Sequence, residues 1–144
     1  MIKLSKLSDY AIVVLSRLSG AEGGVVTVAQ MTTYTGIPEP TVSKVLKLLA
    51  REGIIESTRG ANGGYALKRP ASGITVTELI TALEGPIALT TCIDKQSDEG
   101  GCMIDSLCPL RGGWKKVNDA LTKALDEVSL DDLLIPAPTP RRAS

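Results

Sequence analysis

The first apolar residues of the chain recur at helical spacing. In the stretch 8–19 they include Ala11, Leu15 and Leu18, and steps of four and three positions place them on one face of a helix. We therefore expect a helix here. Ser8 is its expected N-cap, because a serine hydroxyl can accept a hydrogen bond from a free backbone N–H of the first turn.

A helix-turn-helix pattern follows. Thr27 and Gln30 form a capping box, which predicts the start of a short second helix. Gly36 breaks the helical pattern after this helix. A third helix is expected over residues 39–52, with Pro40 in its first turn. Two short helices separated by a tight glycine turn are typical of a helix-turn-helix. The inner face of the third helix is apolar and consists of Val42, Val45, Leu46 and Leu49.

Residues 54–58 and 64–68 are two short strand-like runs, and the residues between them include the pair Asn62-Gly63. An Asn-Gly pair favours a hairpin turn because both residues tolerate positive φ. We expect a β-hairpin, placed after the helix pair as the wing of a winged helix-turn-helix.

A further helix and a long loop come after the hairpin. Thr75 and Glu78 repeat the capping-box pattern and predict a helix over residues 75–84. Residues 87–109 show no periodic pattern and contain all three cysteines. A loop of this length in a compact domain is uncommon unless it is functional or disordered.

The last helix, expected over residues 110–128, carries a heptad seam. Its apolar residues alternate at spacings of four and three, which suits packing along the helix of a partner subunit. We expect the seam to form a homodimer, and packing within the chain is the alternative. The seam consists of Leu110, Trp114, Val117, Leu121, Ala124 and Val128.

These elements predict a mostly α fold with a small β wing, that is, a winged helix-turn-helix with a long C-terminal dimerisation helix. Residues 1–86 are the expected DNA-binding domain, residues 87–109 a cysteine loop, and residues 110–134 the dimerisation helix and C-terminal segment. Residues 135–144, which contain three prolines, are expected to form a disordered tail.

The formal net charge of zero hides an uneven distribution. Residues 38–69 contain six basic and three acidic side chains, a net charge of +3, whereas residues 90–132 contain five basic and nine acidic ones, a net charge of −4. The basic stretch covers the third helix and the hairpin. It is therefore the place where we expect an anionic partner.

Double-stranded DNA is the expected partner. The second helix of a helix-turn-helix contacts base edges in the major groove with its N-terminal residues, and an arginine at a wing tip suits a narrow minor groove. The alternative for each lysine is a solvated charge on an ordinary helix. The candidate residues are Pro40, Thr41, Ser43, Lys44 and Lys47 on the helix and Arg59, Gly60, Asn62, Gly63 and Tyr65 in the wing.

No apolar run is long enough to span a membrane, and no cleavable leader is visible. We expect a cytoplasmic protein, in which thiols stay reduced. Because the number of cysteines is odd, a disulfide framework is not expected.

Cys92, Cys102 and Cys108 are separated by nine and five residues, and the chain contains no histidine. Structural zinc and iron–sulfur clusters each take four protein ligands, so this set lacks one. The spacing leaves open an iron–sulfur cluster, reactive thiols, a zinc site or no metal. An enzyme with Cys102 or Cys108 as nucleophile is not expected, because no histidine base and no glycine-rich nucleotide loop is present.

The chain resembles the Rrf-two family of bacterial transcription regulators over roughly residues 1–134. The resemblance is carried by residues 4–11 (LSKLSDYA), by the wing at 59–65 (RGANGGY), by residues 82–86 (ALEGP) and by the cysteine loop. Residues 40–47 (PTVSKVLK), the wing, and Cys108 followed by Pro109 most resemble the branch that regulates the SUF iron–sulfur assembly operon.

The resemblance implies that Cys92, Cys102 and Cys108 bind a [2Fe–2S] or [4Fe–4S] cluster whose state tunes DNA affinity. One branch of the family places a histidine just after the third cysteine, where this chain has Arg111, and spaces its first two cysteines more closely. Another branch takes an acidic fourth ligand from the first helix of the other subunit. Asp9 matches that position. Stabilisation of the helix start is the alternative role for its carboxylate.

We therefore expect an iron–sulfur-sensing regulator, most simply a repressor, of SUF genes. A thiol-based redox or nitric-oxide-responsive repressor of the same fold, with no cluster, is the main alternative. A winged helix that binds only proteins is a further alternative, and salt-dependent binding to promoter DNA would exclude it.

Overall fold

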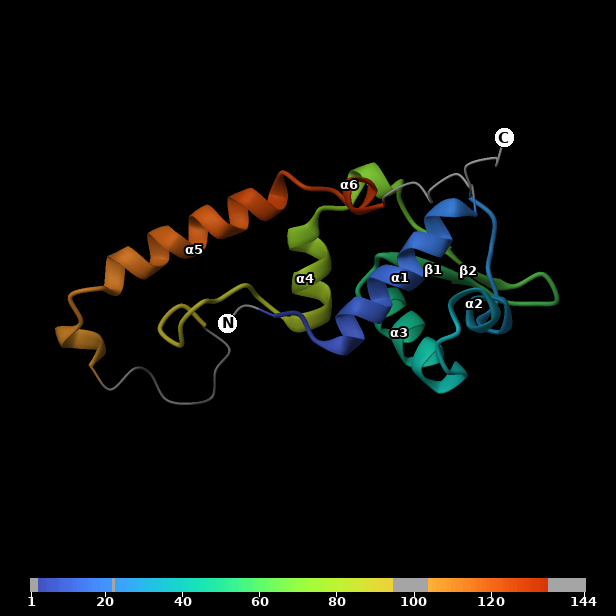
Figure 1. The fold of residues 1–144 in the computed structure, drawn as a ribbon, viewed down its shortest axis with the longest axis horizontal. Helices are drawn as coiled ribbons and strands as arrows, with labels where there is room; N and C mark the ends of the chain where they lie inside the picture. The colour runs from blue at the N-terminus through green and yellow to red at the C-terminus, as the bar shows by residue number, and fades with distance from the viewer. Residues whose placement is uncertain (1–2, 22, 95–103, 135–144) are drawn as a thin grey trace, which may run out of the picture.

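A computed structural model describes residues 3–21, 23–94 and 104–134 of the chain (Figure 1). The fold is mostly helical with one small antiparallel sheet, as expected. Its elements in chain order are α1 (Lys6–Gly20), α2 (Val28–Thr35), α3 (Glu39–Arg51), β1 (Ile55–Thr58), β2 (Gly64–Leu67), the 3-10 turn η1 (Ala71–Gly73), α4 (Val76–Glu84), the 3-10 turn η2 (Asp105–Leu107), α5 (Arg111–Asp126) and α6 (Leu130–Leu133).

One hydrophobic core joins α1, α2, α3, the hairpin, α4 and α6, and these elements together are called the body of the molecule. Burial of its side chains stabilises the body by removing apolar surface from water. The fully buried side chains with no exposed surface include Leu15 of α1, Met31 of α2, Leu46 of α3 and Leu130 of α6. Because α6 closes this core, the end of the described chain returns to the body after α5.

The start of α1 differs from the expectation. Ser5, not Ser8, is the N-cap, and its hydroxyl accepts a hydrogen bond from the backbone N–H of Ser8. Ser8 lies inside the helix and is only 1% exposed. Both serines can cap a helix, but the hydroxyl of Ser8 donates instead to Glu84, which is far away in the sequence.

The helix-turn-helix forms as expected. The capping box of Thr27 and Gln30 is complete, and Gly36 ends α2 in the left-handed conformation with φ 71°. Pro38 is the N-cap of α3, and Pro40 stands in its first turn. These local signals fix the angle at which α3 leaves α2.

The hairpin is also confirmed, and its strands pair from Ile55 with Leu67 to Thr58 with Gly64. An isolated bridge between Val26 and Tyr65 adds the chain before α2 to the edge of the sheet. The wing is thereby tied to the helix-turn-helix through main-chain hydrogen bonds of 2.8 Å in both directions.

The C-terminal part departs from the body. Thr75 caps α4 as expected, but Glu78 bonds Arg69 instead of closing a capping box. In Figure 1, α5 points away from the body, and its C-terminal part lies beside α4. α6 was not expected, and its preceding residue Ser129 forms a bridge with Thr75.

The expected tail and Cys102 lie outside the described residues. None of the helices in the described part is both long enough and apolar enough to cross a membrane.

Candidate functional site

The outer face of α3 is the first candidate surface. The side chains of Lys44 and Lys47 are exposed, and Thr41 and Ser43 are half-buried beside them. The opposite face of the helix is buried in the core, so this face is free for a partner. A continuous hollow on it is lined by Pro40, Ser43, Lys44, Lys47, Leu48 and Arg51.

The wing residues divide into two groups. Arg59, Gly60 and Asn62 are exposed in the turn, and Gly60 has φ 111°, a conformation that glycine adopts readily. Gly63 is half-buried, and its N–H donates to the Gly60 carbonyl over 3.0 Å. Tyr65 is half-buried and packs against the core, so the structure gives its side chain a packing role in addition to the expected contact with DNA.

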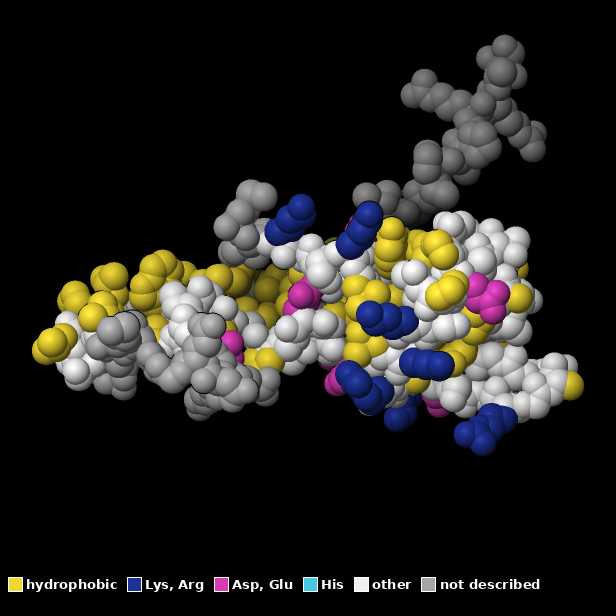
Figure 2. Space-filling view, turned by 90° about the horizontal axis from the view of Figure 1, so that it is seen from below, with side chains coloured by type: hydrophobic (Ala, Val, Ile, Leu, Met, Phe, Trp, Pro, Cys, Tyr) yellow, Lys and Arg dark blue, Asp and Glu magenta, His cyan; other side chains and the backbone are white. Residues whose placement is uncertain are grey.

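The surface charge follows the sequence distribution. Figure 2 looks at the body from below, the side on which the N-terminal end of α3 lies in Figure 1. Lys and Arg side chains gather over this face of the body, with few acidic side chains between them. Such a surface attracts a polyanion.

The cysteine segment begins directly after α4. Cys92 is exposed, and its sulfur lies 3.0 Å from the Thr90 hydroxyl. Thr90 also starts a turn, since its carbonyl accepts from the N–H groups of Ile93 and Asp94. Cys108 is half-buried and follows η2, shortly before α5. Both thiols are therefore free and lie outside the core.

Asn118 of α5 holds the first part of this segment. Its side chain is buried, its Nδ2 donates to the Ile87 carbonyl over 3.0 Å, and its Oδ1 accepts from the Leu89 N–H over 3.0 Å. The buried amide of Asn118 thus bonds both a carbonyl and an N–H group of one stretch of backbone. The path of the chain toward Cys92 is fixed relative to α5.

Asp9 is exposed in the first turn of α1. Thiolate and carboxylate donors are compatible with iron, so the described donors fit a cluster by their chemistry. Among the described residues, however, Asp9, Cys92 and Cys108 do not come together as a group that could hold a metal within one chain.

Sequence reasoning did not single out Glu84, the last residue of α4. Its Oε1 accepts from the Ser5 backbone N–H over 2.8 Å and from the Ser8 hydroxyl over 2.5 Å. The bond from Ser8 is the main cause, and together these bonds hold the pKa of the Glu84 carboxyl below its ordinary value. The only signal in the sequence was the segment 82–86, which carried part of the family resemblance without a stated role.

The seam of α5 is largely uncovered near its start. Leu110, Trp114 and Val117 are 56%, 39% and 49% exposed. Farther along, Leu121 and Val128 are half-buried, and Ala124 is exposed. Exposed apolar side chains in a row at heptad spacing are a typical surface for association with another helix.

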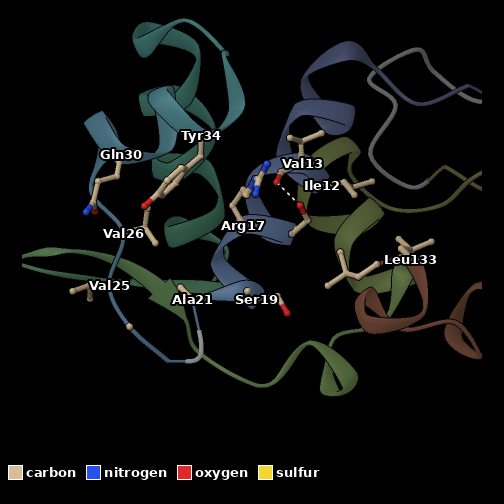
Figure 3. Close-up of a pocket in the computed structure, with 14 residues that line it drawn as sticks. Ile12, Val13, Arg17, Ser19, Ala21, Val25, Val26, Gln30, Tyr34 and Leu133 are labelled. Atoms are coloured by element: carbon tan, nitrogen blue, oxygen red, sulfur yellow. Dashed lines mark hydrogen bonds between the residues drawn. The ribbon is translucent and has the colours of Figure 1, made fainter. Parts of the chain in front are cut away.

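A separate open groove of about 950 Å³ lies between α1, the connection to α2, and α6 (Figure 3). Val13, Arg17 and Tyr34 are among the side chains around it. None of the residues predicted from the sequence to contact DNA, metal or a partner helix lines it.

Comparison with known proteins gives concordant matches. Residues 4–136 match the family Rrf2, "Iron-dependent Transcriptional regulator". The HTH-type transcriptional regulator IscR of Escherichia coli O1:K1 / APEC is 29% identical over 134 residues, which cover 92% of this chain and 80% of that protein. CymR (YrzC), the global cysteine regulator of B. subtilis, superposes with a TM-score of 0.67 at 26% identity, over 92% of this chain and 96% of its own. T. potens IscR superposes with a TM-score of 0.62 at 25% identity, over 92% of this chain and 85% of its own.

Proposed function

Because this chain belongs to the Rrf2 family of transcription regulators, we propose that it is a homodimeric repressor of SUF iron–sulfur assembly genes that senses an iron–sulfur cluster. Proteins of this family regulate transcription and are not enzymes. The observation that carries the proposal is the exposed basic face of α3 beside a wing, on the same chain as free thiols in a segment attached to α5.

DNA binding is assigned to α3 and the wing. The N-terminal residues of α3 enter the major groove, where Lys44 and Lys47 contact phosphates or guanine edges. Arg59 at the wing turn reaches the adjacent minor groove. Its glycine neighbours let the backbone approach the DNA closely.

The dimer is assigned to α5. The seam from Leu110 to Val128 packs against the same helix of a second copy, which removes the exposed Trp114 and Val117 side chains from water. Two copies of α3 then face two half-sites of one operator.

Cys92, Cys102 and Cys108 are the proposed thiolate ligands of the cluster, and Asp9 of the other subunit is the proposed fourth ligand. The cluster, when bound, supplies an iron centre that responds to oxidants and to iron supply. The family description names iron dependence, which supports iron over zinc.

A cluster-free thiol sensor is the second candidate function. Cys92 is exposed and within 3.0 Å of a hydroxyl, so an oxidant can reach its sulfur. The structural similarity to the cysteine regulator CymR favours this candidate as well.

Anaerobic purification separates the two candidates. We expect visible absorption with stoichiometric iron and sulfide, and cluster-dependent binding to DNA from the promoter region of the protein's own gene. A colourless protein that stays colourless after reconstitution, yet changes DNA affinity on thiol oxidation, would support the thiol sensor. Affinity that does not fall with rising salt would contradict DNA binding altogether.

Substitution of the two lysines tests the DNA-binding surface. Lys44→Ala and Lys47→Ala remove one phosphate contact each, so each is expected to reduce the slope of log affinity against log salt by about 1. Lys123→Ala, an exposed lysine of α5, is the matched control and leaves that slope unchanged. Fluorescence anisotropy with a labelled promoter fragment measures the affinity at each salt concentration, and these affinities give the slope.

A further inference from the structure

Glu84 completes the N-terminal cap of α1 from a distant element. In a capping box, a Glu or Gln at the third helical position accepts a hydrogen bond from the N-cap N–H. The third position of α1 is Ser8, whose side chain bonds elsewhere, and the N-cap N–H of Ser5 donates to Glu84 over 2.8 Å. α1 has Asp9 in its first turn, but the carboxylate that accepts from the Ser5 N–H is supplied by α4.

The same carboxylate is the acceptor for the Ser8 hydroxyl over 2.5 Å. Ser8 is 1% exposed, and a buried hydroxyl without a partner is costly. A negative charge at this end of α1 also interacts favourably with the helix dipole. The first turn of α1 thus depends on Glu84 through two hydrogen bonds and one charge interaction.

Glu84 itself is exposed on its outer side. The bond from the Ser5 N–H is exposed and the bond from the Ser8 hydroxyl is part-buried, and water can replace both when the two elements separate. The contact can therefore form and break without leaving a buried unpaired charge, unlike a buried ion pair.

Along the chain, Glu84 is followed directly by the cysteine segment. Gly85 follows with φ 92° and ψ −176°, a conformation almost restricted to glycine. Pro86 adds a fixed φ, and Asn118 holds Ile87 and Leu89 by their backbones. Only seven residues separate Glu84 from Cys92, and the backbone of 85–87 and 89 is restrained in these ways.

We propose that Glu84 is the positioning residue that couples the cysteine segment to α1. A change in the path of the segment around Cys92 moves the end of α4, breaks or tightens the bonds from Glu84 to Ser5 and Ser8, and so loosens or fixes the first turn of α1. Because α1 packs directly on α3, the change reaches the DNA-binding helix. This inference rests on the proposed sensing function.

Hydrogen exchange measures the coupling in the protein without a cluster. Loss of an N-cap interaction destabilises a helix start by about 1 kcal/mol, so Glu84→Ala is expected to speed exchange in the first turn of α1 about fivefold. Glu84→Gln keeps an acceptor oxygen and restores part of the protection. Glu127→Ala at the C-cap of α5 removes a carboxylate from another surface and leaves this exchange unchanged.

DNA affinity measured with and without reconstitution by iron and sulfide tests the transmission. Wild-type protein and Glu127→Ala are expected to bind promoter DNA with different affinities in the two states. In Glu84→Ala the two affinities converge to within about twofold, while its iron and sulfide content stays that of the wild type. A purely structural role for Glu84 would lower stability and leave the ratio of the two affinities intact.

The outcomes separate the inference from the function on which it rests. If the wild type responds and Glu84→Ala responds as fully, the inference is wrong and the proposed function stands. If the wild type responds neither to reconstitution nor to hydrogen peroxide, the sensing function fails and the inference fails with it. Should Glu84→Ala not fold, Ser8→Ala removes the 2.5 Å bond from the other side and the same criteria apply.

Discussion

At the scale of single residues, Gly64 and Gly73 have different constraints. A Cβ on Gly64 would lie 2.8 Å from the carbonyl oxygen of Val26, whereas a Cβ on Gly73 would meet no heavy atom within 4 Å. We predict that Gly64→Ala lowers the free energy of unfolding by about 1–3 kcal/mol, a typical cost of overpacking. Gly73→Ala changes it by less than about 1 kcal/mol. Urea denaturation measures both, and equal effects would contradict the close approach of the wing to Val26.

Glu84 also makes folding stability depend on pH. The bonds from Ser8 and Ser5 lower the pKa of this carboxyl from its ordinary value of 4.5. The folded protein therefore binds the proton less readily than the unfolded chain. The stabilisation is fully present above the unfolded pKa and is lost as the pH falls through the lower, folded pKa.

Glu84→Gln cannot titrate, so it is expected to weaken the loss of stability between about pH 5 and pH 3. Urea denaturation at several pH values in this window, for the wild type and the variant, gives the comparison. The same fall in unfolding free energy in both proteins would show that the carboxylate does not hold α1 in solution.

At the scale of elements, the sequence was most informative where a signal is local. The Thr27 capping box and the Gly36 turn each act within a few residues and form as predicted. The hairpin also forms, but the glycine with positive φ in its turn is Gly60 and not Gly63. The expectation failed for Ser8, because the carboxylate that accepts from its hydroxyl is 76 positions away. α6 was missed for the same reason, since a four-residue helix is stabilised by burial of Leu130 in a distant core rather than by its own pattern.

The candidate site shows the same difference between local and distant signals. Helical periodicity was enough to separate the outer face of α3 from its buried face, and hairpin chemistry was enough to locate the wing. Periodicity could not reveal that Asn118 fixes the cysteine segment, because a lone polar residue on a helix says nothing of the backbone it contacts. Such contacts depend on how α4 and α5 cross.

The seam of α5 gives a prediction for an isolated element. Trp114→Glu places a charge among side chains that the proposed dimer would remove from water, so the dimer is expected to dissociate and DNA affinity to fall at least tenfold, about 1.4 kcal/mol. Lys116→Glu, on an exposed position of the same helix, is the control. Sedimentation velocity measures the association state. A Trp114→Glu protein that remains dimeric would assign the seam to packing within the chain.

At the scale of the whole molecule, the proposed cluster and dimer raise the question of which subunit would supply each ligand. In Figure 1, α5 carries the described end of the cysteine loop away from the body that holds α1, and Asp9 forms no ligand group with the described cysteines of its own chain. In the proposed dimer, pairing of α5 helices would bring a second body toward that loop. A fourth ligand from the partner would then link cluster binding to the dimer.

Mixed dimers test this arrangement directly. One combination pairs a chain carrying Asp9→Ala with a chain carrying Cys92→Ser, Cys102→Ser and Cys108→Ser; the other pairs a chain carrying all four substitutions with a wild-type chain. If Asp9 acts across the dimer, the first combination holds one complete set of ligands and the second holds none. If Asp9 acts within its own chain, the assignment is reversed.

Each mixed dimer is isolated through two different affinity tags, reconstituted, and challenged with an iron chelator. We expect the first combination to retain iron and sulfide about tenfold longer than the second, because only its cluster has the fourth protein ligand, and ligand-sphere changes typically cost 10–100-fold in metal affinity. The opposite order would place Asp9 in the same chain as its cysteines. Equal loss from both would return Asp9 to the role of a carboxylate that stabilises the start of α1.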